Sequence, residues 1–190
     1  DAERKIFEKL ILLLSEENSK YLNPEKITKL RNKAQTVTKK RAAIRCFILT
    51  LFLYLAQKDH EFHFNTPVLE IIEELLIDYF PSCFMTENVD HEFAFFLLYI
   101  CYEIYFFKMA NNPQHFSLKL EKFVKSFAVW HRKDFWEEFL KFAKSVVVNP
   151  FVSFNVSLPK NFGIKLQVTN WQKIYLYAIN LGFYLLKLPF

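Results

Sequence analysis

Glycine is almost absent from this sequence: only Gly163 and Gly182 occur among its 190 residues. Phosphate-binding loops and tight catalytic turns are built from glycine, because it adopts positive φ and allows close backbone approach. The sequence has no glycine-rich loop before a helix and no serine in a G-x-S-x-G setting. These absences argue against P-loop and hydrolase-elbow chemistry. We therefore predict a protein that is not an enzyme and that uses no cofactor.

Cysteine is also scarce, and Cys46, Cys83 and Cys101 are scattered without a C-x-x-C pair. An odd, dispersed set of this kind is typical of reduced core thiols in intracellular proteins. The charged first residues do not form a secretory signal, so we predict a cytoplasmic or nuclear location. A first residue other than methionine and an apolar end predict that residues 1–190 are a single helical domain of a longer polypeptide.

Long hydrophobic runs are missing as well. The two longest apolar stretches begin at Cys46 and Phe93, and both fall short of the roughly 20 residues that a membrane-spanning helix needs. We predict that they are buried central helices and that the chain has no membrane span.

Acidic residues are absent after Glu138, and charge is segregated along the chain. Residues 1–60 carry a net charge of +6, residues 61–110 carry −8 and residues 111–190 carry +7. Two interpretations are open. The acidic middle pairs with basic neighbours inside the fold, or the basic blocks face an acidic protein, nucleic acid or anionic lipid.

Aromatic residues are abundant, with 23 phenylalanines and nine tyrosines that supply apolar area for a core and for partner surfaces. Helical periodicity predicts helices over residues 2–15, 24–37, 38–58, 67–80, 90–109, 113–127 and 134–147, with a last helix after residue 170. Asn23 and Thr66 each precede a proline and are predicted N-caps. Pro81 is predicted to end the fourth helix.

Alternating apolar and polar residues predict a β-hairpin near residues 151–169. The predicted fold is therefore mainly α, with about eight helices in an irregular bundle or a short HEAT-like array and one small hairpin.

Candidate chemical residues are few. His60 and His63 are spaced one residue short of the zincin motif, so we predict loop histidines and no metal site. Cys83 and His91 lie within reach along the chain but form no recognisable nucleophile motif. Four carboxylates share one side of the fourth helix and are predicted to form a solvated face: Glu70, Glu73, Glu74 and Asp78.

Two basic groups are candidates for binding. One surrounds the start of the third helix, where the helix N-terminus favours phosphate; it consists of Lys33, Lys39, Lys40, Arg41 and Arg45. The other is the turn from Trp130 to Trp136, which flanks Arg132 with aromatic rings, as base stacking requires. The structural alternative is that Trp130 and Trp136 are core anchors beside a solvated basic loop.

We predict a scaffold or adaptor domain that binds a peptide or helix of another protein in an aromatic-lined groove. Its predicted contact residues are Trp130, Arg132, Trp136 and Trp171, because tryptophan and arginine are enriched at binding hot spots. The alternative is a nucleic-acid or phosphate-binding domain that uses the basic blocks 26–45 and 119–187. A third interpretation is a carrier that holds a lipid or another apolar ligand in a cavity among the phenylalanines.

Overall fold

The computed structural model describes residues 2–38, 41–56, 63–84 and 90–145, together with Lys173, Ile174 and Tyr177. In these residues the chain is mainly α, as predicted, and it forms no strand. The helices are α1 (Ala2–Leu13), α2 (Pro24–Val37), α3 (Arg41–Ala56), α4 (Thr66–Phe84), α5 (His91–Ala110), α6 (Lys119–Lys125) and α7 (Lys133–Ser145). Three short 3-10 turns connect them: η1 (Glu17–Ser19), η2 (Pro113–His115) and η3 (Ala128–His131). The predicted hairpin at 151–169 and most of the predicted last helix lie outside the described residues.

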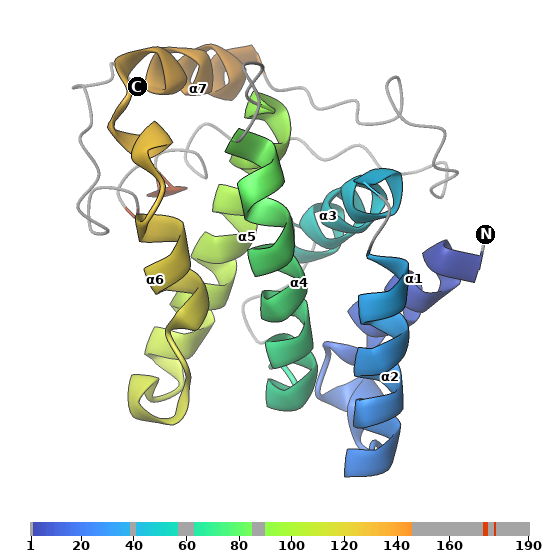
Figure 1. Cartoon of the computed structure of the whole chain (residues 1–190). Coiled ribbons are helices and arrows are strands. Elements are labelled where there is room, and N and C mark those ends of the chain that lie inside the picture. The colour runs from blue at the N-terminus through green and yellow to red at the C-terminus, as the bar shows by residue number, and fades with distance from the viewer. Residues whose placement is uncertain are drawn as a thin grey trace.

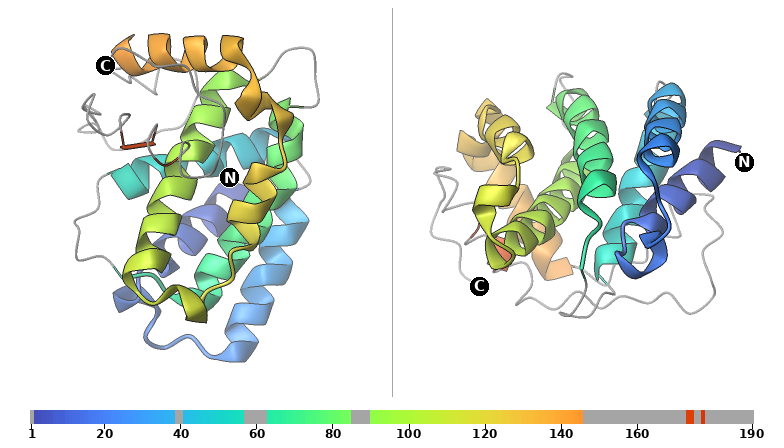
Figure 2. Two further views of the ribbon diagram at one scale, coloured as in Figure 1. Left: turned by 90° about the vertical axis from the view of Figure 1, so that its left-hand side faces the viewer. Right: turned by 90° about the horizontal axis from the view of Figure 1, so that it is seen from below.

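Helix α5 is the centre of the arrangement and packs against α3, α4, α6 and α7. Helix α4 lies between α2 and α6, which cover opposite sides of it (Figures 1 and 2). Helix α7 crosses one end of α5, and α1 packs against α2, α3 and α4. The two most apolar segments of the sequence, in α3 and α5, are therefore the central helices that their composition predicts.

Helix α5 has the extent that its periodicity predicts to within one residue, but it is longer than its apolar run. It extends over 20 residues, because polar residues at both ends join the apolar run, and in length and composition it could cross a membrane. Among the described residues no other helix meets both criteria. Most of this stretch is buried against neighbouring helices, as in the core helix of a globular protein.

The N-cap of α2 is confirmed, but that of α4 is not Thr66. The Asn23 side chain accepts a hydrogen bond from the Lys26 amide at 2.9 Å, with Pro24 in the first turn. In α4 the capping side chain is Asn65, whose Oδ1 accepts from the Val68 amide at 3.1 Å. The Asn65 backbone amide also bonds the Leu14 carbonyl, so a tertiary contact fixes where α4 begins.

Pro81 does not end α4, and this prediction was wrong, because the helix continues to Phe84. A proline inside a helix costs about 3 kcal/mol. The last turn of α4 offsets this cost by packing Phe80 and Phe84 against Phe127 and Trp130 at ring-centroid distances of 5.2–6.5 Å. Full burial of a phenylalanine side chain contributes roughly 1.5–3 kcal/mol; Phe80 is fully buried and Phe84 is partly buried, so we attribute the helix end to aromatic packing.

The predicted sixth helix also begins later than expected. Asn112 and Pro113 open only the turn η2, with Asn112 in the left-handed region at φ 75°. Asparagine tolerates this conformation better than most residues. The α-helix itself starts at Lys119, after an extended residue at Phe116.

Candidate functional site

The structure places two of the four predicted contact residues in the core. Trp130 and Trp136 are fully buried. Their Nε1 atoms donate to the carbonyls of Val124 at 2.6 Å and Trp130 at 2.7 Å. They are thus the core anchors of the structural alternative, and a role in binding a partner stays a prediction. Arg132 is exposed and forms a two-pronged ion pair with Asp134. Trp171 lies outside the described residues.

The described members of the predicted phosphate site have different surroundings. Lys33 is exposed on α2. Arg45 on α3 pairs with Asp90 at 2.5 Å, and its guanidinium lies 4.2 Å from the centroid of the Phe93 ring. Lys39 and Lys40 lie outside the described residues, and Arg41 is described only as the first residue of α3.

Among the described residues, the histidine and cysteine candidates show no metal-binding arrangement. His63 is exposed, whereas His60 lies outside the described residues. His91 packs against the rings of Phe95 and Phe135. Cys83 is buried, and the described residues contain no group of three histidine, cysteine or acidic side chains that could hold a metal ion.

A groove of about 390 Å³ lies between α1 and α2. Its apolar lining consists of Ile6 and Leu13 from α1, Leu22 before α2, and Leu30 from α2. The other lining residues are lysines from both helices: Lys5, Lys9, Lys26, Lys29 and Lys33. We call this site the lysine-rimmed groove.

The rim of the lysine-rimmed groove is strongly cationic. All five lysines are exposed, and the lining contains no acidic residue. Lys29 pairs with Glu25 at 2.5 Å. The other four lysines form no ion pair with a described residue. Their alkyl stems extend the apolar floor, while their ammonium groups remain in water.

The residues that line this groove follow a regular spacing in the sequence. Lys5, Lys9 and Leu13 are spaced at i, i+4 and i+8 on α1. Lys26, Lys29 and Lys33 are spaced at i, i+3 and i+7 on α2. Each row lies on one helical face, beside the face that enters the core. Only the packing of α1 against α2 brings the two rows together.

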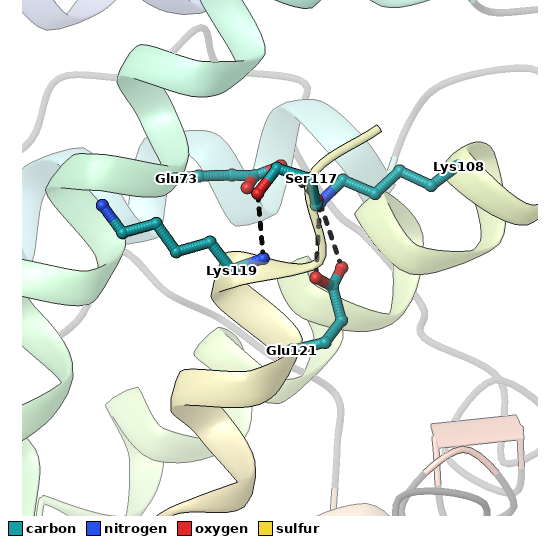
Figure 3. A network of polar contacts seen from close by, with 5 residues as sticks. All are labelled: Glu73, Lys108, Ser117, Lys119 and Glu121. Atoms are coloured by element: carbon teal, nitrogen blue, oxygen red, sulfur yellow. Dashed lines mark hydrogen bonds and ion pairs between the residues drawn. The ribbon is translucent and has the colours of Figure 1, made fainter. Parts of the chain in front are cut away.

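A second polar site lies inside the molecule, where α4, α5 and α6 meet (Figure 3). The Lys108 Nζ on α5 lies 2.7 Å from Glu73 Oε1 on α4 and 3.3 Å from both carboxylate oxygens of Glu121 on α6. It also donates to the Ser117 carbonyl at 2.6 Å. We call Glu73, Lys108 and Glu121 the buried polar cluster, because each is at most 5% exposed.

The buried polar cluster corrects the prediction that the acidic side of α4 is a solvated face. Glu70 and Asp78 are exposed, and Glu74 pairs with Arg31 of α2 at 3.4 Å, but Glu73 points into the core. Burial raises the pKa of Glu73 to about 7, although the Lys108 ammonium opposes the shift. Burial also raises the pKa of the nearby Cys101 thiol.

Periodicity could have identified the members of this cluster. Glu73 continues the buried stripe formed by Leu69, Ile72, Leu76 and Phe80. Lys108, the single lysine in residues 61–110, continues the stripe of Cys101 and Ile104. A charged residue at a core position indicates a buried partner of opposite charge.

The segregated charges of the sequence are thus partly paired inside the fold. Arg31 and Arg45 pair with Glu74 and Asp90 of the acidic middle, whereas the lysines of the groove face solvent. Comparisons with protein-family models, with curated proteins and with solved structures find no match to this chain.

Proposed function

We propose that the protein is an interaction domain whose lysine-rimmed groove binds an acidic amphipathic helix of a partner protein. The observation that carries the proposal is the composition of the groove, which combines an apolar floor with lysines on both sides. A partner helix would place apolar residues at i, i+3, i+4 and i+7 on the floor. Glutamate or aspartate beside that stripe would then meet the lysines.

The chain itself has little with which to fill this groove. Residues 139–190 contain no acidic residue, so this part of the chain cannot neutralise the rim. Glu73, Glu74 and Asp90 of the acidic middle are already paired elsewhere. Charge complementarity therefore favours a partner outside residues 1–190.

The proposed partner is a protein helix, as the sequence predicts, but the proposed binding groove differs from the predicted aromatic-lined groove. The groove is lined by aliphatic side chains and lysine, with no aromatic ring. This composition also favours a protein over nucleic acid, because base stacking requires aromatic or arginine side chains. Lysine remains a phosphate ligand, so nucleic acid is an outcome that the experiment must distinguish.

The test uses two designed, fluorescently labelled helical peptides with the same leucine stripe. One carries glutamate beside the stripe and the other carries lysine at the same positions. We expect fluorescence anisotropy to show at least tenfold tighter binding of the acidic peptide, with an affinity that falls as salt rises. Equal affinities, or binding of a single-stranded oligonucleotide in preference to the acidic peptide, would contradict the proposal.

The double variant Lys9→Glu/Lys26→Glu locates the binding site. It reverses the charge on both sides of the groove, and we expect it to lower the affinity for the acidic peptide at least tenfold. The matched control is Lys122→Glu/Lys125→Glu, which makes the same charge change on exposed residues of α6. Equal losses in the two variants would show that net charge, and not the groove, attracts the peptide.

A further inference from the structure

The buried polar cluster has an imbalance of charge. Two carboxylates, Glu73 and Glu121, share one ammonium group, that of Lys108, in a site closed to solvent. With all three groups ionised the cluster carries a net charge of −1. Burying an excess charge is costly unless a proton neutralises it. A single bound proton leaves one neutral carboxyl group and one balanced ion pair.

The same cluster fastens the connection between α5 and α6. Lys108 Nζ donates to the Ser117 carbonyl, and Ser117 Oγ accepts from the Lys119 amide at 3.2 Å (Figure 3). Glu121 follows in the first turn of α6. This ammonium group thus connects α5 to α6 through Glu121 and to α4 through Glu73.

We propose that the buried polar cluster is a proton-operated latch: with one proton bound it holds residues 117–121 against α4 and α5, and without that proton it loosens them. Glu73 is the group that takes the proton, because the burial of its carboxylate outweighs the attraction of the Lys108 ammonium. The other groups that face it are Lys108 and Cys101 on α5, Glu121 on α6 and Glu70 on its own helix. The Tyr177 hydroxyl, which is also buried, faces Cys101 and Glu121.

The direction of the pH effect follows from the raised pKa of Glu73. Unfolding returns its pKa from about 7 to the ordinary value of 4.5. Between these values the folded state holds a proton that the unfolded state lacks, so stability falls as pH rises. The stabilisation is fully present below pH 4.5 and is lost as pH passes 7. Over this window one proton changes the unfolding constant by up to about tenfold per pH unit.

The first test is the variant Glu73→Gln, measured by urea unfolding from pH 5 to pH 8. We expect wild type and variant to be similar at pH 5, and the unfolding constant of the variant to be at least tenfold lower at pH 8. The matched control Glu70→Gln, on the exposed side of α4, should follow the wild type at every pH. A Glu73→Gln variant that is less stable at pH 8 would overturn the proposal.

The second test examines the wild type directly and does not depend on a variant that folds. In protein labelled with ¹³C-glutamate, the Glu73 carboxyl resonance should titrate near pH 7. Titration below pH 5 would overturn the assignment of the proton to Glu73.

The third test measures the latch itself through the alkylation rate of Cys101. At pH 8 the wild type should react faster than Glu73→Gln, because its latch is loosened. The Glu73 charge raises the pKa of the Cys101 thiol, so its removal in the variant would by itself speed alkylation, and a faster reaction of the wild type therefore reports the loosened latch. Equal rates would show that the proton does not loosen this part of the fold.

Discussion

Lysine serves two opposite purposes in this molecule. In the lysine-rimmed groove five lysines stand in solvent around an aliphatic floor, and four of them have no ion pair with a described residue. In the buried polar cluster one lysine, Lys108, is 1% exposed and contacts two carboxylates and a carbonyl. The comparison teaches that surroundings, and not residue type, decide whether a cation is available to a partner or committed to the fold.

Removing the cation of the buried polar cluster is expected to have the largest effect on stability. Lys108→Met leaves Glu73 and Glu121 buried without a counter-charge, and we expect a loss of about 3–5 kcal/mol in the free energy of unfolding. The matched control is Lys33→Met in the groove, where an exposed residue should change stability by less than about 0.5 kcal/mol. Urea unfolding at pH 8 measures both. Similar losses in the two variants would remove the distinction between the sites.

A smaller effect is expected when the whole cluster is replaced. In the triple variant Glu73→Leu/Lys108→Met/Glu121→Leu no charge remains buried, and such replacements are often neutral or stabilising. We expect the triple variant to recover most of the stability lost in Lys108→Met, measured by the same unfolding experiment. A loss as large as that of the single variant would mean that the hydrogen bond to Ser117, and not charge balance, carries the stability.

The smallest effect distinguishes lysines within the groove. Lys29 already pairs with Glu25 at 2.5 Å, whereas Lys26 on the same helix has no ion pair with a described residue. We expect Lys26→Ala to lower the affinity for the acidic peptide by roughly two- to fivefold, since exposed ion pairs contribute about 0.2–1 kcal/mol. Lys29→Ala should lower this affinity less, because Glu25 competes with the peptide for the Lys29 ammonium group. Anisotropy titrations at low salt are sensitive enough to separate the two.

The core and the groove differ in how far the sequence predicts them. Seven helices agree in type with their periodicity, and the cap at Asn23 needs only local residues. The capping of α4 by Asn65 and the continuation of this helix past Pro81 depend instead on contacts with Leu14 and with the aromatic rings of Phe127 and Trp130. Those partners are distant in sequence, so no local pattern contains them.

The predicted site residues show the same division. Tryptophan is enriched at binding hot spots and suits a core anchor equally well, so only burial separates the two roles of Trp130 and Trp136. The sequence does not reveal the groove, because each of its two lysine rows is an ordinary solvated face when α1 or α2 is considered alone.

The helical class and the central position of α3 and α5 follow from the sequence alone, because composition and periodicity are local properties. Tertiary structure alone decided which charges are buried and which are free. Glu73 and Glu74 are neighbours on one helix, yet one enters the core and the other meets Arg31 at the surface. The energy of a charge depends on its distance from solvent and from opposite charges, and only the packing of α2, α4, α5 and α6 sets those distances.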